Sequence, residues 1–296
     1  MAGLVSVDAL KPRWRELRLR FHLLNRNLLV RVALIVIAVE IVLAIIAPWI
    51  APHPLSISGI ADPALKLLPP SLTYPFGTDE LGRDIFSRVL YGTRISLGAG
   101  TITVALALLI GVPLGAIAGF KAGFVDDLIM RITDVFLSFP SLLMAIVIAA
   151  FLGPSLRNAI LACAISWWPW YTRIIRGQAI SIRERQFVRA SKAIGTPGPR
   201  IVFGHVLPNC MGPIIVQASL DFGSVVLILS ALSFLGLGAQ APTPEWGLMI
   251  NTSRNYFMSA WWYIIFPGLG IVITVLAFNL LGDGLREILD PRTRKY

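Results

Sequence analysis

The sequence predicts an all-α polytopic membrane protein with six transmembrane helices. Of its 296 residues, 56% are hydrophobic and only 14% are charged, and the mean hydropathy is +0.74. A soluble protein of this size carries roughly a quarter charged residues, because it needs a wetted surface. Lipid must therefore be the solvent for much of the chain, which divides into spans and loops rather than soluble domains.

Six apolar stretches account for this composition. A bilayer core about 30 Å thick is crossed by roughly 20 helical residues, and the stretches near this length are 32–50, 95–120, 132–152, 156–175, 210–237 and 260–281. The fourth is the least regular, since Pro169 interrupts it and Arg173, near its end, can extend its guanidinium to the interface. The first lacks a small-residue cleavage site after it, so we expect an uncleaved anchor rather than a signal peptide.

The basic residues predict that the N- and C-termini are both cytoplasmic. Cytoplasmic loops carry an excess of Lys and Arg, and this orientation places 20 of the 26 on the inner side. These residues punctuate the apolar runs and form no single face, so the net charge of +10 does not indicate a nucleic-acid partner. The chain then divides into a cytoplasmic segment (1–31), a first helix with an extracytoplasmic loop (32–94), a five-helix core (95–282) and a cytoplasmic tail (283–296).

Two charged clusters lie beside the spans. Three arginines between residues 83 and 94 fall on the predicted outer side, with the spacing of a basic amphipathic turn and acidic residues among them. Asp127, Arg131 and Asp134 lead into the third span at intervals of four and three residues. This spacing predicts that they pair with one another along one helix face.

Five residues within the spans stand out. Gly111, Gly115 and Gly119 recur every four residues, which places them on one stripe where a neighbouring helix can approach closely. Tight helix packing is the plain interpretation, and a role in a transport pathway is the alternative. Glu40 and Asp221 are intramembrane carboxylates. Such groups are expensive in lipid, so they indicate either a proton relay or a polar partner on another helix.

No catalytic constellation is present in the sequence. The histidines are distributed among three loops or tails, and no HExxH, GxSxG or Cys/His cluster occurs. No Gly-Lys dipeptide exists, so the chain has no P-loop for ATP. Cys163 and Cys210 lie in or beside apolar segments, where a small buried hydrophobe is the expected role. We expect a transport protein rather than an enzyme, with no metal or cofactor bound by this chain.

The inner loop after the fourth span carries a short predicted helix. Phe187, Ala190 and Ile194 fall at i, i+3 and i+7, so they share one face, and basic residues occupy much of the rest. Gly195 is placed to end the helix in a left-handed conformation. A second short helix is predicted to follow and to stop at 207–208. The apolar stripe suits either a helix lying on anionic lipid or a projection that docks into a groove on a partner protein.

This loop resembles the "EAA" coupling loop of ABC-importer permeases, in which Glu-Ala-Ala, three residues, Gly, nine residues, Ile, one residue and Leu-Pro follow in order. The chain departs from that pattern at Arg189, Ser191 and His205, which stand for the Glu, the second Ala and the Ile. Within the loop 181–208, the resemblance assigns contacts with an ATPase to Phe187, Arg189, Ala190, Ser191, Ala193, Ile194, Gly195, Leu207 and Pro208.

Three further segments, 76–88, 235–247 and 278–286 with Leu289-Asp290-Pro291, resemble the C-type permease of dipeptide, oligopeptide and nickel importers. The resemblance runs over nearly the whole chain. It implies the type I ABC importer permease fold in an inner or plasma membrane, with a homologous B-type permease, two ATP-binding subunits and an extracytoplasmic solute-binding protein as partners. ATP and Mg²⁺ would bind to the partner ATPases.

The substrate is less narrowly indicated than the family. Peptides are the first expectation from the resemblance, while oligosaccharides, glutathione, opines and nickel stay open. The alternative mechanism is a proton-coupled secondary transporter that uses Glu40 or Asp221. That alternative predicts transport that survives loss of the ATPase and stops with an uncoupler.

Overall fold

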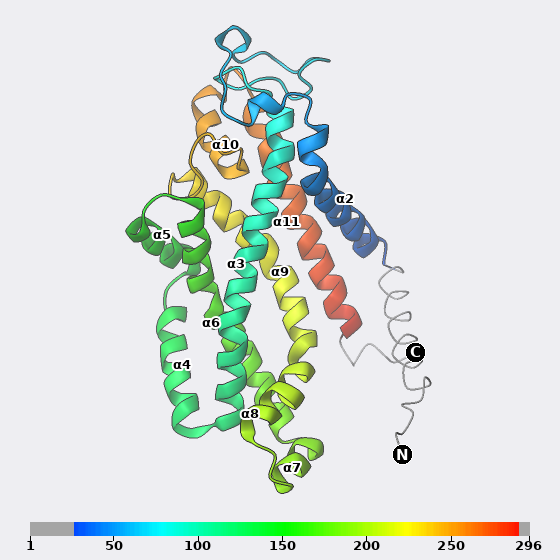
Figure 1. Ribbon diagram of the computed structural model, residues 1–296, viewed down its shortest axis with the longest axis vertical. Coiled ribbons are helices and arrows are strands. Elements are labelled where there is room, and N and C mark those ends of the chain that lie inside the picture. Colours follow the sequence, from blue (N-terminus) through cyan, green and yellow to red (C-terminus); the bar gives the residue numbers. More distant parts are fainter. Residues whose placement is uncertain (1–26, 290–296) are drawn as a thin grey trace, which may run out of the picture.

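The computed structural model describes residues 27–289, and these fold almost entirely into helices (Figure 1). The helices are α2 (Leu28–Ile50), α3 (Ile85–Lys121), α4 (Gly123–Leu137), α5 (Ser141–Leu152), α6 (Leu156–Arg183), α7 (Gln186–Ala193), α8 (Gly198–Ile201), α9 (Leu207–Phe234), α10 (Trp246–Ser253) and α11 (Trp262–Leu289). A π-helical turn (Val202–Val206) joins α8 to α9, and short 3₁₀ turns lie at 54–56, 63–65 and 254–256.

Four helical segments are long and apolar enough to cross a membrane: α2, α3, the segment from α8 to the end of α9, and α11. The pair α4 and α5 makes a fifth candidate if the two helices, bent by 86°, form one span. The all-α membrane fold that was predicted is thus present. The 28-residue α6, predicted as the fourth span, is long enough to cross but less apolar than these.

The third predicted span is not one helix. Instead of a continuous helix over 132–152, α4 starts at Gly123 and stops at Leu137, and α5 starts at Ser141. Pro140 lies at the break, and a residue before proline is pushed out of the α-helical region. The apolar composition runs on through the break, which is why composition alone predicted a single span.

Four other spans are longer than predicted, and α3 and α6 exceed the prediction most. α3 starts at Ile85, ten residues before the predicted start, because the Asp84 carboxylate accepts hydrogen bonds from the Phe86 and Ser87 amides and so caps the helix. α6 runs through Pro169, where an interruption was predicted, and ends at Arg183, eight residues beyond the predicted 175. The additional residues include charged side chains, so they fall outside the apolar stretches from which the spans were predicted.

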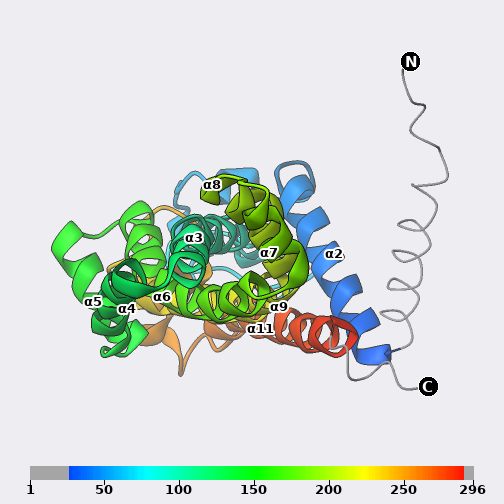
Figure 2. The same ribbon diagram turned by 90° about the horizontal axis from the view of Figure 1, so that it is seen from below.

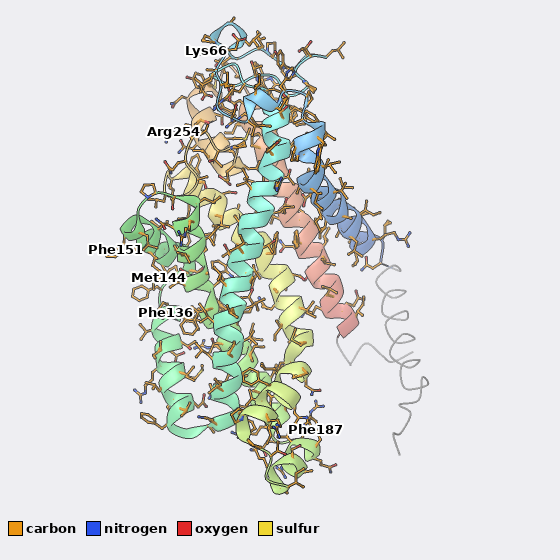
Figure 3. All side chains as sticks on the ribbon, in the orientation of Figure 1. Lys66, Phe136, Met144, Phe151, Phe187 and Arg254 are labelled. Carbon is orange, nitrogen blue, oxygen red and sulfur yellow. The ribbon has the colours of Figure 1, made fainter. Side chains whose placement is uncertain are left out.

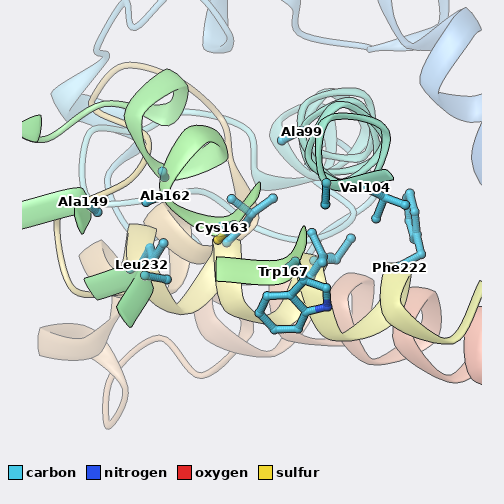
Figure 4. Close-up of a cluster of buried hydrophobic side chains, with 14 of the residues drawn as sticks. Ala99, Val104, Ala149, Ala162, Cys163, Trp167, Phe222 and Leu232 are labelled. Atoms are coloured by element: carbon cyan, nitrogen blue, oxygen red, sulfur yellow. The ribbon is translucent and has the colours of Figure 1, made fainter. Parts of the chain in front are cut away.

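The core of the bundle lies where α3, α6 and α9 meet. Its largest buried side chains include Trp167 and Tyr171 of α6 and Phe222 of α9, packed with small residues such as Cys163. Figure 4 shows Val104 of α3 and Phe222 of α9 facing each other beside Trp167. The small residues bring the helix backbones close together, as is usual in membrane helix packing.

The two ends of the bundle differ. The loop 51–84 and α10 cover one end, and α7 and α8 project from the other (Figure 1). Seen from below, α7 and α8 lie across the ends of α3 and α9 (Figure 2). The start of α2 packs against the end of α11, since an added Cβ on Gly284 would meet Val30 at 2.2 Å.

Candidate functional site

A hairpin formed by α7 and α8 contains most of the residues predicted to contact an ATPase. Gly195 lies between the two helices with a φ of 78°, a left-handed conformation that glycine adopts without a steric penalty. A Cβ added there would meet nothing within 4 Å. The backbone conformation, rather than crowding, is therefore what favours glycine at this position.

The hairpin exposes apolar side chains. Ile194 is 82% exposed and Phe187 is 41% exposed, and Ala190 and Ala193 are exposed as well. Figure 3 shows Phe187 at the lower end of the molecule, far from the loop at the other end that carries Lys66. These side chains are available to a partner or to lipid, because this chain leaves them uncovered.

Val188 anchors α7 to the bundle. Its side chain is fully buried in a cluster with Ile182, Ile201 and Val206. On the same hairpin, the Lys192 ammonium lies 4.6 Å from the centre of the Phe120 ring of α3, a cation–π distance. Val188 was not among the predicted site residues, because in the sequence it is only an apolar residue outside the predicted stripe.

The three positions that depart from the EAA pattern make contacts in the hairpin and in the segments directly before and after it. Ser191 Oγ lies 3.4 Å from His205 Nε2, so two of the departures meet. Arg189 donates a hydrogen bond to the exposed Glu184 carboxylate at 2.8 Å. That bond, with a second from Arg183, holds the pKa of Glu184 below its usual range.

Leu207 and Pro208 lie in the first turn of α9. The prediction that a second short helix stops at 207–208 is wrong, because α8 continues through the π-helical turn into α9 without a break. Proline lacks a backbone N–H, and Pro208 is accommodated directly after the π-helical turn. The hairpin is thus joined directly to a long helix.

Gly111, Gly115 and Gly119 form the contact surface of α3 with α6. A Cβ added to each would lie 2.4–2.5 Å from a backbone carbonyl oxygen of α6, those of Trp168, Thr172 and Arg176 in turn. The residue numbers rise together in the two helices, so α3 and α6 run parallel. Glycine at these positions permits the approach.

Glu40 and Asp221 each have a neutral hydrogen-bond partner. The Thr274 hydroxyl of α11 donates to Glu40 Oε1 at 2.8 Å, which links α2 to α11. The Gln217 amide donates to Asp221 Oδ1 at 3.0 Å within α9. The two carboxylates lie on different helices.

Two of the three arginines between residues 83 and 94 are buried and bound to neighbouring groups. Arg83 and Asp79 are buried and joined by a 2.6 Å ion pair. The buried Arg88 donates to the Ser56 carbonyl at 3.1 Å, and only Arg94 is exposed. Asp79 and the Ser56 carbonyl compensate these buried guanidiniums in part, because Arg88 Nε lies 3.6 Å from Asp79 without a hydrogen bond. The Arg88 contact with Ser56 ties the loop 51–84 to the start of α3.

The charged residues of α4 pair across helices rather than along α4. Arg176 of α6 binds Asp126 through two hydrogen bonds of 2.5 and 2.7 Å. Arg173 of α6 pairs with Asp134. The predicted pairing of Arg131 with its neighbours on α4 gives way to these contacts between helices, which hold α4 against α6.

No metal centre is formed by the described residues: between 27 and 289, no three His, Cys, Asp or Glu side chains are grouped to hold an ion. Cys163 and Cys210 are buried and free. The described residues form two exposed surfaces. One is the hairpin with its apolar side chains, and the other is a polar surface along α4.

Two family models match the chain. The binding-protein-dependent transport system inner membrane component matches residues 111–295, and the N-terminal TM domain of oligopeptide transport permease C matches residues 13–70. Together they include the hairpin, α4 and the residues around Glu40.

Curated relatives and solved structures agree with these matches. The chain is 49% identical over 281 residues to the dipeptide transport system permease protein DppC of Alkalihalophilus pseudofirmus, covering 95% of this chain and 90% of that protein. It is 47% identical over 258 residues to the probable D,D-dipeptide transport system permease protein DdpC of Escherichia coli, covering 87% and 86%. A chain of the inward-facing MetNI methionine ABC transporter shares the fold, with a TM-score of 0.56, 17% identity, and coverage of 69% of this chain and 97% of that one.

Proposed function

Because the chain belongs to the family of binding-protein-dependent transport system inner membrane components, we propose that it carries di- and oligopeptides across the membrane together with a homologous permease. It is a non-catalytic, multi-pass inner membrane subunit of an ABC importer, with the type I importer permease fold. Such a permease works with a partner permease, an ATPase and a binding protein. The specific complex has one B-type permease, two ATP-binding subunits and an extracytoplasmic solute-binding protein.

The proposed topology has six spans with both termini in the cytoplasm. The spans are α2, α3, the bent pair α4–α5, α6, α9 and α11. The hairpin and the outer loop lie at opposite ends of the bundle, and the start of α2 lies beside the end of α11, as this topology requires. The excess of basic residues near the hairpin supports a cytoplasmic position for that end.

The observation that carries the proposal is the geometry of the hairpin. Val188 fixes one side of α7 to the bundle, while Ile194 and Phe187 extend from it uncovered. An apolar helix face of this kind fits a hydrophobic groove on a partner. The hairpin docks into a cleft of the ATPase, and its direct connection to α9 transmits movement of the ATPase to the spans.

Peptides are the proposed substrates because the two relatives named above are dipeptide permeases. The solute-binding protein that associates with this complex selects the ligand. Identification of the ligand it carries would separate peptides from oligosaccharides, glutathione, opines and nickel.

The function is tested with Ala190→Asp in the complete importer. A carboxylate on the exposed stripe is expected to abolish ATP-driven dipeptide uptake into proteoliposomes and to reduce co-purification of the ATPase, while the subunit reaches the membrane at normal levels. Arg189→Ala is the matched control and should be milder, since Arg189 binds Glu184 in the same chain.

Other results would contradict the proposal. Normal ATPase association by Ala190→Asp, with altered lipid binding, would favour a helix that lies on the membrane. Uptake by the unaltered importer that needs no ATPase and stops with an uncoupler would favour a proton-coupled transporter.

A further inference from the structure

An exposed polar stripe runs along α4. Asp127, Arg131, Asp134 and Ser138 recur at intervals of four, three and four residues, which places them on one side of the helix, and all four are exposed. The neighbouring side of α4 is also exposed but apolar, and consists of Phe124, Leu128, Ile132 and Val135. The uncovered surface of α4 is therefore divided lengthwise into a polar half and an apolar half.

The upper end of the stripe lies deep within the membrane-spanning part of the bundle. The Phe136 ring of α4 packs edge-on against Trp168 of α6, with ring centres 5.4 Å apart, and the Trp168 carbonyl lies against Gly111 of α3. Gly111 precedes Lys121 by ten residues, about 15 Å along a helix axis. Because 95–120 has no charged residue, this level is about halfway through a 30 Å hydrocarbon core.

The chain breaks its helical structure at this level. α4 ends at Leu137 and α5 begins at Ser141, close after Phe136, and the backbone turns by 86°. Figure 3 shows Phe136 partway along the bundle, with Met144 and Phe151 of α5 above it. Irregular backbone at membrane depth is tolerated where protein or a water-filled cavity covers it, and not where lipid does.

A half-exposed ion pair lies just below the break. The side chains of Arg173 and Asp134 are 52% and 57% exposed. Both residues lie between the level of Gly111 and the Lys121 end of α3, since the neighbouring Thr172 contacts Gly115. Charged side chains at such depth face the interior of an assembly or water. This is a second, independent reason why lipid does not cover this face.

We propose that the polar stripe of α4, with Arg173 and the break at 138–140, lines the water-filled passage of the assembled importer. The inference rests on the proposed function, because a second permease must close the other side of the passage. The passage opens at the Lys121 end of the bundle and reaches the break near mid-membrane. The apolar half of α4 and the apolar exposed face of α2 then face lipid or packed protein.

Cysteine reactivity in the assembled importer tests this assignment. With Cys163 and Cys210 replaced by alanine, Ser138→Cys is treated with a charged, membrane-impermeant methanethiosulfonate in nucleotide-free inverted vesicles. Val39→Cys is the control for lipid, because Val39 lies midway along α2 and is 51% exposed. Ala149→Cys is the control for dry packing, because Ala149 of α5 is fully buried.

Ser138→Cys should react at least about tenfold faster than either control, since an apolar environment raises the pKa of a thiol and leaves little reactive thiolate. Arg131→Cys, lower on the same stripe, should react at least as fast and serves if Ser138→Cys assembles poorly. Reaction of both stripe positions with only a lipid-soluble maleimide would assign the stripe to lipid, and no reaction with either reagent would assign it to a dry subunit contact. Either result overturns the inference.

ATP-driven uptake is measured for the same variants in proteoliposomes that have the solute-binding protein outside and ATP inside. Full uptake by variants whose stripe cysteines do not react would refute the proposal that α4 lines the passage, and would leave the proposed function intact. Absence of ATP-driven uptake by the unaltered importer would refute the proposed function, whatever the labelling shows.

Discussion

At the residue scale, the close approach of α3 to α6 depends on the absence of side chains at three positions. The Thr172 carbonyl lies only 2.4 Å from the point that a Cβ on Gly115 would occupy. The Thr172 hydroxyl also donates to the Gly111 carbonyl at 3.1 Å, a polar contact between the two helices that a wider separation would break. At Gly98, earlier on α3, an added methyl group would have no heavy atom within 4 Å. The same helix thus offers a crowded glycine and an open one.

We expect Gly115→Ala to destabilise the importer by about 1–3 kcal/mol, the usual cost of overpacking a close contact. Gly98→Ala should be neutral or slightly stabilising, because alanine is a better helix former than glycine by roughly 1 kcal/mol. Thermal denaturation of the purified complexes, followed by the fraction that stays monodisperse in size-exclusion chromatography, measures the difference. Equal melting temperatures for the two variants would show that the α3–α6 contact tolerates separation.

At the element scale, the hairpin combines an anchored helix with a turn that only glycine adopts freely. The φ of 78° at Gly195 costs an L-residue about 1–2 kcal/mol. Because an added Cβ would have no atom near it, a substitution there changes the direction of the turn rather than the packing. Gly177 of α6 is a matched control, with open space and no positive φ.

Gly195→Ala should therefore lower the amount of substrate moved per ATP hydrolysed, while Gly177→Ala should not. The expected cause is a reoriented α7 that engages the ATPase less well, so membrane levels of both variants should match the unaltered chain. Parallel measurement of uptake and phosphate release in proteoliposomes gives the ratio. An unchanged ratio for Gly195→Ala would mean that the conformation of this turn does not matter for coupling.

The elements that depend on composition could be predicted from the sequence, and those that depend on the backbone conformation at one position could not. The spans of α2, α3, α9 and α11 follow from long apolar runs. The break before Pro140 interrupts no apolar run and was missed. Pro169 was predicted to interrupt its span, but α6 continues through it. Proline alone does not decide between a break and a continuous helix, because packing against neighbouring helices can support either.

Contacts between helices were the other feature that could not be predicted from the sequence. Intervals of three and four residues predicted ion pairs along α4, but Arg173 and Arg176 of α6 form the ion pairs with the α4 carboxylates. Spacing within one helix cannot reveal a partner on another. The hairpin stripe was recognised because its pattern is local, whereas its anchor Val188 depends on residues from α6 and the segment after α8.

At the scale of the whole molecule, the two ends of the bundle are built for different surroundings. The end that carries loop 51–84 is held by buried ion pairs and by side chains packed around Ile85, Met249 and Tyr263, so this loop is fixed to the bundle. The opposite end presents the hairpin on a single anchored side. A fixed surface at one end and a projecting hairpin at the other suit a subunit that meets different partners at its two ends.

The orientation of these ends is testable in intact cells. Leu72→Cys, whose parent side chain is fully exposed in the loop 51–84, should react with an impermeant thiol reagent, and Ile194→Cys, whose parent side chain is 82% exposed on the hairpin, should not. The basic residues near the hairpin oppose its translocation, which is the physical reason for this orientation. The unaltered chain should not be labelled, because its two cysteines, Cys163 and Cys210, are buried.

Permeabilised cells provide the control, since Ile194→Cys must then become reactive if the membrane alone protected it. The chain is expressed for this purpose without its ATPase, so that a docked subunit does not shield the hairpin. Labelling of Ile194→Cys in intact cells, together with protection of Leu72→Cys, would invert the topology. It would also place the hairpin where no cytoplasmic ATPase reaches it, and would thereby remove the physical basis for coupling through α7.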